Sequence, residues 1–332
     1  MSVHRPGRAG ALILATLGVI GAGIACGADG TSSVTRLIML GTQGGPRPSV
    51  DRAQPANLLV VNGVDYLIDA GNGVARQLAL AGVSPTNIHQ IFITHNHDDH
   101  NADWGTLMGL AWTLGGTAPI TVHGPPGTES MREGFLRYFA PNAAARSDEG
   151  VNGLAPAKFM LAQDITRAGP VYQDANVRVT AVENCHYHFK AGSPGYGWQR
   201  SFAFRFQTPD RVVVFSGDTG PCGEVLTQFA KGADILVHEV IDLEAIERLV
   251  RARPSGTGPS AERRAALVQH LTLDHSSPEE VGRVAAGAGV SLLVLSHIVG
   301  SASSEEAEAR YLAGVRKNFS GRVVVAKDLM QF

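Results

Sequence analysis

Residues 95–100 hold the densest group of potential metal ligands in this sequence, with three histidines and two aspartates in six positions. The chain has 12 histidines among 332 residues, so such a cluster is not expected by chance. Neutral imidazole nitrogen and carboxylate oxygen are the ligands that borderline-soft divalent metals prefer, and zinc is the commonest fit. The motif therefore predicts a metal site, with a polar loop that binds nothing as the plainer alternative.

The sequence around this motif places it at the end of a strand. Residues 88–93 form an apolar run that is typical of a buried strand, and a helix is predicted directly after the motif. In the extended turn between them, His95 and His97 point the same way and could share one ion. Asp99 and His100 come from the next bend, where they can face a second ion.

Other potential ligands follow predicted strands further along the chain, which is where α/β scaffolds carry functional residues. They are Asp69, His186 (with His188 close behind it), Asp218 and His297. His275 stands just before a predicted helix in which Ser277 caps the first turn and Pro278 occupies it. One helix and one strand separate His275 from His297, so both histidines could emerge on the same rim.

The His-x-His-x-Asp-His pattern resembles the signature of the metallo-β-lactamase superfamily of binuclear hydrolases. The likeness continues in order with Leu-Gly-Thr before a Gly/Pro loop (residues 40–46), Gly-Pro-Pro-Gly-Thr (124–128) and Ser-Gly-Asp-Thr (216–219). Within the superfamily the chain is most similar to the ribonuclease Z-like branch, and inside that branch to its arylsulfatase-like members. The resemblance implies an α/β fold, a four-layer αββα sandwich over residues 34–332, with metals between the sheet edges.

The division into two sheets also has some support in the sequence itself. Strand and helix content falls into two halves of similar make-up that meet near Pro170. Residues 148–172 show no clear periodicity and are predicted to be a surface excursion between the halves. Residues 251–262 are rich in Pro, Gly, Ser and Arg, and they are predicted to form a flexible loop.

The resemblance also implies a set of seven ligands for two divalent ions, of which zinc is the first choice and manganese or iron the alternatives. One ion is assigned to His95, His97 and His186. The other is assigned to Asp99, His100 and His297. Asp218 would bridge the two ions with its two oxygens. Asp69 would orient the metal loop (residues 94–100) by hydrogen bonding, and it could equally cap the helix that follows it.

The chemistry expected of such a site is hydrolysis. Two bridged divalent ions lower the pKa of a shared water and yield a bridging hydroxide as the nucleophile. His275 is the candidate general acid for the leaving group, because imidazole titrates near working pH, and Asp99 is placed in the catalytic set as well. A structural metal site is disfavoured, since structural zinc sites are closed and usually rich in thiolates.

The leading functional prediction is hydrolysis of a small anionic ester, either an aryl sulfate or a phosphodiester. Nucleic acid is not expected, because the net charge is −2 and the pI is about 6.6. The resemblance implies an RNA-gripping arm between His186 and Asp218 in tRNA-cutting members, and here that interval is predicted to be mostly strand. Processing of tRNA 3′ ends, a lactonase or β-lactamase, and a binding protein without activity are the alternatives. Homodimer formation is left open.

Residues 1–28 have the layout of a secretory signal peptide. A positively charged start precedes an apolar run at residues 11–24, which is short for a membrane span, and small residues follow. A helical anchor is the alternative. Cys26 lies in a weak lipobox and is a candidate for a lipid anchor. We therefore expect export to the periplasm or cell envelope, with no membrane span in the mature chain.

Two cysteines remain once the predicted signal peptide is removed. Cys185 directly precedes the expected ligand His186, and Cys222 follows the expected bridge Asp218. Their segments should therefore pass near one another. An oxidising compartment would favour a disulfide between them, whereas two buried thiols that never meet are the alternative.

Overall fold

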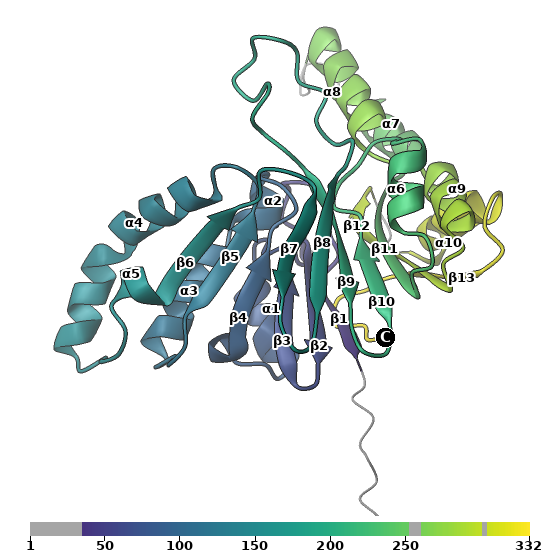
Figure 1. Cartoon of the computed structure of the whole chain (residues 1–332). Coiled ribbons are helices and arrows are strands. Elements are labelled where there is room, and N and C mark those ends of the chain that lie inside the picture. Colours follow the sequence, from purple (N-terminus) through teal and green to yellow (C-terminus); the bar gives the residue numbers. More distant parts are fainter. Residues whose placement is uncertain (1–34, 252–259, 301–303) are drawn as a thin grey trace, which may run out of the picture. The chain divides into compact units, whose positions relative to one another are not determined.

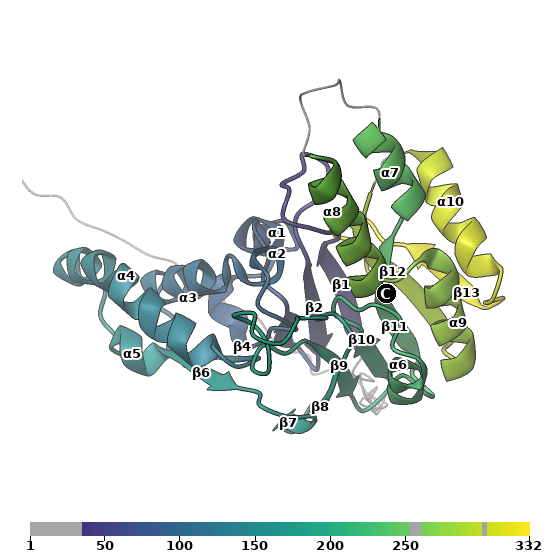
Figure 2. The same ribbon diagram turned by 90° about the horizontal axis from the view of Figure 1, so that it is seen from above.

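The computed structural model describes residues 35–251, 260–300 and 304–332. The predicted signal peptide and Cys26 lie outside these residues. Within them, two β-sheets face each other, and helices cover the outer side of each sheet (Figure 1, Figure 2). This four-layer αββα sandwich confirms the predicted α/β fold. No helix in the described part of the chain is long and apolar enough to cross a membrane.

In the described residues, the strands of the first sheet follow the order β1-β2-β3-β4-β5-β6. Pairing is antiparallel from β1 to β3 and parallel from β3 to β6. The strands are β1 (Arg36–Gly41), β2 (Ala56–Val61), β3 (Val64–Ile68), β4 (Ile88–Phe92), β5 (Ile120–Gly124) and β6 (Met160–Asp164). The helices among them are α1 (Val74–Leu80), the 3₁₀ turn η1 (Pro85–Asn87), α2 (Asp98–Asn101), α3 (Trp104–Thr113), α4 (Thr128–Asp148) and α5 (Pro156–Phe159).

In the part of the chain that the structure describes, the second sheet has the strand order β13-β12-β11-β10-β9-β8-β7. It repeats the plan of the first, because pairing is antiparallel from β7 to β10 and parallel from β10 to β13. The strands are β7 (Gly169–Gln173), β8 (Arg178–Glu183), β9 (Phe202–Gln207), β10 (Val212–Phe215), β11 (Ile235–Ile241), β12 (Leu292–Val299) and β13 (Arg322–Val325). The helices are α6 (Glu224–Phe229), α7 (Leu243–Arg251), α8 (Ala261–Asp274), α9 (Pro278–Ala288) and α10 (Glu305–Arg316).

Apolar side chains fill three layers between these elements. One layer packs the first sheet against α1, α3 and α4, one lies between the two sheets, and one packs the second sheet against α6, α9 and α10. In the middle layer, the ring of Phe92 meets those of Phe204 and Phe206 edge-on, with centroids 5.9 and 5.1 Å apart. Aromatic contacts of this kind therefore link β4 of one sheet to β9 of the other.

Serine side chains begin three of the helices around the second sheet. Each accepts a hydrogen bond from a backbone N–H in the first turn, which satisfies one of the donors that a helix start leaves free. The caps are Ser260 on α8, Ser277 on α9 and Ser304 on α10. The Ser277 cap, with Pro278 in the first turn, confirms the predicted start of that helix and fixes the backbone just after His275.

Two predictions for the chain between the motifs are wrong. Residues 148–172, predicted to be a surface excursion, contain α5, β6 and most of β7. These are edge strands of the two sheets and are only partly buried, so they lack the alternating pattern that identifies a strand. Residues 260–262, assigned to the predicted loop, contain the cap and first turn of α8.

Replacement of Phe92 by alanine is expected to lower the free energy of unfolding by about 3–5 kcal/mol, because it opens a cavity between the two sheets. Urea denaturation of the mature domain measures this change. Val50 is fully exposed, and Val50→Ala serves as the control with an expected change within about 0.5 kcal/mol. Equal stability of the two variants would contradict the role given to the Phe92 cluster.

Candidate metal centre

The structure brings the predicted ligands from both sheets into one cluster. Its members come from the β4–α2 loop and α2, from the segments that follow β8 and β10, and from β12 itself. Three sets of side chains each have ligand atoms within 4.8 Å of one another. The sets are His95, His97, His186 and Asp218; Asp99, His100 and His297; and Asp218, His275 and His297. All seven residues assigned to the two ions are therefore gathered at one place.

Asp218 is the centre of this cluster and is almost completely buried. Its Oδ1 lies 3.2 Å from His100 Nε2, and its Oδ2 lies 3.0 Å from His297 Nε2. The same Oδ2 lies 3.8 Å from His95 Nε2. Oδ1 thus faces the second assigned group, and Oδ2 faces histidines of both groups, so Asp218 lies between the two groups.

The spacing of the donors fits divalent ions. Ligand atoms held about 2.0–2.2 Å from one ion lie about 3–4 Å apart, which matches the distances around Asp218. In the first group, His186 Nε2 lies 3.1 Å from His97 Nδ1. His95 Nε2 is buried and makes no hydrogen bond. Such an atom costs free energy unless a partner satisfies it, and a cation between His95, His97 and His186 would do so.

The histidines of the cluster fall into two groups, because burial and nearby carboxylates shift their pKa values in opposite directions. Burial lowers the pKa values of His95, His97 and His186, that of His186 to about 3, so these rings are neutral donors. At His100 and His297 burial acts the same way, but the carboxylates of Asp218 and its neighbours outweigh it and raise both pKa values, that of His297 to about 10. Divalent cations would therefore compete with protons at His100 and His297.

Asp69 holds the metal loop in place from the end of β3. Its Oδ1 accepts the backbone N–H of Thr94 at 2.8 Å, and its Oδ2 lies 2.9 Å from His100 Nδ1. That contact occupies the far nitrogen of His100 and leaves Nε2 facing Asp218. Asp69 has a positive φ of 59°, so the backbone itself turns here to aim the carboxylate at the loop.

His297 reaches the cluster through an irregularity in β12. The register between β11 and β12 shifts at this point, because Glu239 pairs with Ser296 while Val240 pairs with Ile298. His297 is the extra residue, with a positive φ of 42°. A bulge of this kind re-aims one side chain out of the regular ladder, here toward Asp99 and Asp218.

The glycine-rich loop after β1 closes over His297. A Cβ at Gly44 would lie 2.8 Å from His297 Nδ1 and 2.7 Å from Val299 Cγ2, so only glycine allows this close approach. The next residue, Gly45, donates its backbone N–H to Asp99 Oδ2 at 2.9 Å. The loop predicted from the Leu-Gly-Thr motif thus positions a member of the second group.

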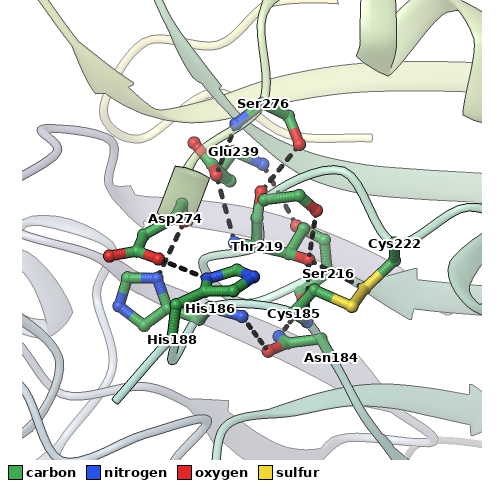
Figure 3. Close-up of a disulfide and its surroundings, with 11 residues drawn as sticks. Asn184, Cys185, His186, His188, Ser216, Thr219, Cys222, Glu239, Asp274 and Ser276 are labelled. Atoms are coloured by element: carbon green, nitrogen blue, oxygen red, sulfur yellow. Dashed lines mark hydrogen bonds and ion pairs between the residues drawn. A yellow bond between two sulfur atoms is a disulfide. The ribbon is translucent and has the colours of Figure 1, made fainter. Parts of the chain in front are cut away.

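His186 and His188 separate clearly in the structure. His186 Nδ1 donates to the carbonyl of Asp274 at 2.9 Å, which leaves its Nε2 toward His97. His188 instead places Nδ1 2.5 Å from the carboxylate of Asp274 (Figure 3). His186 therefore joins the cluster, whereas His188 turns away from it and belongs to none of the ligand sets in the described residues.

Glu239 of β11 is buried and lies among the predicted site residues. Its Oε1 accepts the backbone N–H groups of Thr219 and Ser276, at 3.1 and 3.0 Å. The same oxygen lies 3.2 Å from His275 Nδ1. His275 Nδ1 is also 4.0 Å from Asp218 Oδ2. Glu239 thus ties His275 to the segment that carries Asp218.

Cys185 and Cys222 form a disulfide, with Cα atoms 5.4 Å apart and a sequence separation of 37 (Figure 3). Of the two alternatives left open by the sequence, the structure contains the bonded one. The backbone N–H of Cys185 also donates to Thr219 Oγ1 at 3.2 Å. The end of β8, which carries His186, is thereby fastened to the segment after Asp218.

The sequence matches one family profile and is similar to proteins named Ribonuclease Z. The profile described as Beta-lactamase superfamily domain matches residues 65–298. The chain is 31% identical over 297 residues to Ribonuclease Z of Mycobacterium bovis BCG Pasteur, covering 88% of this chain and 96% of that protein. Ribonuclease Z of Mycobacterium marinum is 30% identical, with the same shares covered.

Solved structures similar to this one share its architecture. The metallo-beta-lactamase fold protein YhfI from Bacillus subtilis has a TM-score of 0.62 and 19% identity, covering 90% of this chain and 99% of that chain. The short form of human tRNase Z has a TM-score of 0.60 and 22% identity, covering 90% and 98%. At these identities the likeness bears on the fold alone.

Replacement of both cysteines by serine is expected to lower the free energy of unfolding by about 3–4 kcal/mol, the chain-entropy value for a loop of this length. Because His186 adjoins Cys185, the variant should also retain less metal after dialysis. Urea denaturation and elemental analysis measure the two effects. Reduction with tris(2-carboxyethyl)phosphine, which has no thiol to compete for metal, should reproduce both effects in the unaltered protein and leave the double variant unchanged. Unchanged stability and metal content of the unaltered protein after reduction would refute this function of the disulfide.

Proposed function

Because the chain belongs to the metallo-β-lactamase superfamily and to its ribonuclease Z-like branch, we propose that it is a metal-dependent phosphodiesterase. The observation that carries this proposal is the complete cluster around Asp218, to which both sheets contribute. Relatives named Ribonuclease Z align with nearly all of the described chain, so RNA is the first substrate class to test.

The proposed roles follow the geometry of the cluster. His95, His97 and His186 would hold one ion. Asp99, His100 and His297 would hold the other, and Asp218 would serve both. When bound, two divalent ions supply Lewis acidity that activates water and neutralises charge on the phosphoryl oxygens. We propose zinc, because the donors are imidazoles and carboxylates, and Asp99 is proposed both as a ligand and as a member of the catalytic set.

His275 is proposed to protonate the leaving oxygen. Its Nδ1 faces Glu239, so we assign the proton to be transferred to Nε2. Burial opposes the charged form of His275, but the Glu239 carboxylate outweighs burial and raises the pKa of the ring. A histidine that keeps its proton near neutral pH can donate it as the ester bond breaks.

Two substrate classes remain in this proposal. The relatives favour RNA and count against the expectation, drawn from net charge, that nucleic acid is not a ligand. A small anionic ester, a phosphodiester or an aryl sulfate, is the second candidate. The observation that favours it is the short interval between His186 and Asp218, which holds only one loop and the β9–β10 pair.

Export is the second part of the proposal. The predicted signal peptide supports it, and so does the Cys185–Cys222 disulfide, because such bonds persist mainly in oxidising compartments. Fractionation of the native cell, with detection of the chain outside the cytoplasm or inside it, tests this part directly.

A substrate panel on zinc-loaded protein tests the proposed activity. It contains a tRNA precursor with a 3′ trailer, bis(p-nitrophenyl) phosphate, p-nitrophenyl sulfate, a lactone and a β-lactam. We expect hydrolysis of the two phosphodiester substrates. Turnover of only the sulfate, the lactone or the β-lactam would overturn the phosphodiesterase proposal.

Asp218→Ala is expected to abolish phosphodiester hydrolysis, because no other side chain in the cluster can face both ion positions. Metal content should fall from roughly two ions per chain to one or fewer. Elemental analysis and the chromogenic assay measure the two effects. The exposed Asp98 lies within the motif, between the proposed ligands His97 and Asp99, and Asp98→Ala is the matched control with near-normal activity and metal content expected. Full activity of the unaltered protein after exhaustive chelation would defeat the two-ion assignment.

His275→Ala is expected to slow hydrolysis while both ions stay bound. The loss should be about 10²–10⁴-fold for an alkyl leaving group and much smaller for p-nitrophenolate, which leaves without a proton. Rates on the two esters, together with metal content, separate this function from ligation. Loss of one ion in the variant would instead identify His275 as a ligand, an assignment that its place in the third ligand set also allows.

A further inference from the structure

An unusual group of aromatic rings lies in the segment that follows the disulfide. Residues 187–199 contain four aromatic rings besides that of His188, and three of them are substantially exposed. They are Phe189 at 39%, Tyr196 at 55% and Trp198 at 47%. Large apolar rings exposed together on a soluble protein often mark a binding surface.

This aromatic loop (residues 187–199) starts directly after the proposed metal ligand His186, and its first ring packs against two proposed ligands. The Tyr187 ring lies 4.9 Å from the ring of His186 and 5.4 Å from that of His97, measured between centroids. Phe189 stacks on the outer side of the group, with its centroid 4.6 Å from that of Tyr187 and the planes 28° apart. A continuous aromatic surface therefore leads from the cluster to the exposed ring of Phe189.

The backbone between these two rings is anchored. His188, which separates them in sequence, contacts the Asp274 carboxylate through Nδ1 at 2.5 Å (Figure 3). The other oxygen of Asp274 pairs with His270 of α8. The His188–Asp274–His270 contacts thus tie the first part of the loop to α8, and they hold Tyr187 and Phe189 beside the cluster rather than leaving them to move freely.

The far end of the loop returns to the metal motif. Asn96, which stands between two proposed ligands, donates from Nδ2 to Gln199 Oε1 at 3.1 Å. A Cβ at Gly127 would lie 3.4 Å from Trp198 Cζ3 and 3.6 Å from Asn96 Nδ2, so the indole ring and Asn96 meet at that glycine. The indole N–H donates to the carbonyl of Pro194 at 2.6 Å, which fixes the ring within the loop.

We propose that Phe189 and Trp198, backed by Tyr187, form a subsite that stacks the nucleobase next to the phosphodiester to be cleaved. The inference rests on the proposed phosphodiesterase function. Stacking on aromatic rings accepts every base, because each base presents a planar π-face. Lys190 is exposed next to Phe189 and provides a cation for an adjoining phosphate. The subsite thus selects nucleotide esters over esters without a planar base.

Two chromogenic esters with one leaving group test this selection. The first is thymidine 5′-(p-nitrophenyl phosphate) and the second is ethyl p-nitrophenyl phosphate, so only the group that stays on phosphorus differs. The unaltered protein should prefer the thymidine ester in kcat/KM. Phe189→Ala and Trp198→Ala should each lower that preference about 10-fold, the effect of losing one stacked ring. Trp198→Phe should restore most of it.

Tyr138 is the control, because it is an exposed aromatic residue on α4 whose ring packs against Phe135. Tyr138→Ala should leave the ratio of the two rates unchanged. Equal losses on both esters in the Phe189 and Trp198 variants would overturn the base subsite, since the shared nitrophenyl group or the loop itself would then account for them.

A binding measurement keeps the subsite testable without turnover. Trp104 and Trp112 are buried, so Trp198 is the exposed tryptophan among the three in the chain. Uridine monophosphate should quench its fluorescence, whereas ribose 5-phosphate should not, and the signal should vanish in Trp198→Phe. If the unaltered protein hydrolyses neither ester and also fails to cleave the tRNA precursor, the proposed function fails. Absence of quenching by the nucleotide would overturn the subsite itself.

Discussion

The burial of the Asp218 carboxylate is the constraint on which the site depends. A carboxylate with almost no contact with water is tolerated only where positive charge or hydrogen bonds replace the lost hydration. His100 and His297 supply that charge in the structure, and they hold the pKa of Asp218 well below its ordinary value even though burial would raise it. Divalent ions would replace these protons with stronger charge, which explains why seven polar side chains can share one buried place.

Delivering those side chains requires distorted backbone at several places. Asp69 and His297 both have positive φ, and a register shift in β12 turns His297 inward. Such conformations cost about 1–3 kcal/mol each and persist only where the surrounding structure enforces them. The three apolar layers provide that enforcement, because they fix the strands whose ends carry the ligands. The packing that stabilises the sandwich therefore also holds the ligand side chains in position.

How far the sequence could predict this structure depends on whether a residue acts locally. The strand before His95 and the cap at Ser277 follow from short-range patterns, and both match the structure. The prediction of the fold relied on motifs that occur in the same order as in a known family, rather than on hydrophobic periodicity. Contacts between distant segments were harder to predict, because the link from Glu239 to His275 joins a residue of β11 to one between α8 and α9 and leaves no local pattern. The edge strands β6 and β7 were missed because neither has a fully buried face.

The rim of the site, rather than its centre, separates the substrate classes. The ligand cluster would serve RNA and a small ester equally, since either presents a charged phosphoryl group to the same donors. Discrimination must come from groups that touch the rest of the substrate, and near the cluster these are the aromatic loop and α8. Asp274 connects the two, because its carbonyl orients His186 while its carboxylate contacts His188 and His270. A substrate that moved the loop would therefore also shift Asp274 and, through it, the proposed metal ligand His186. Recognition at the rim would in this way be coupled to the chemistry at the centre.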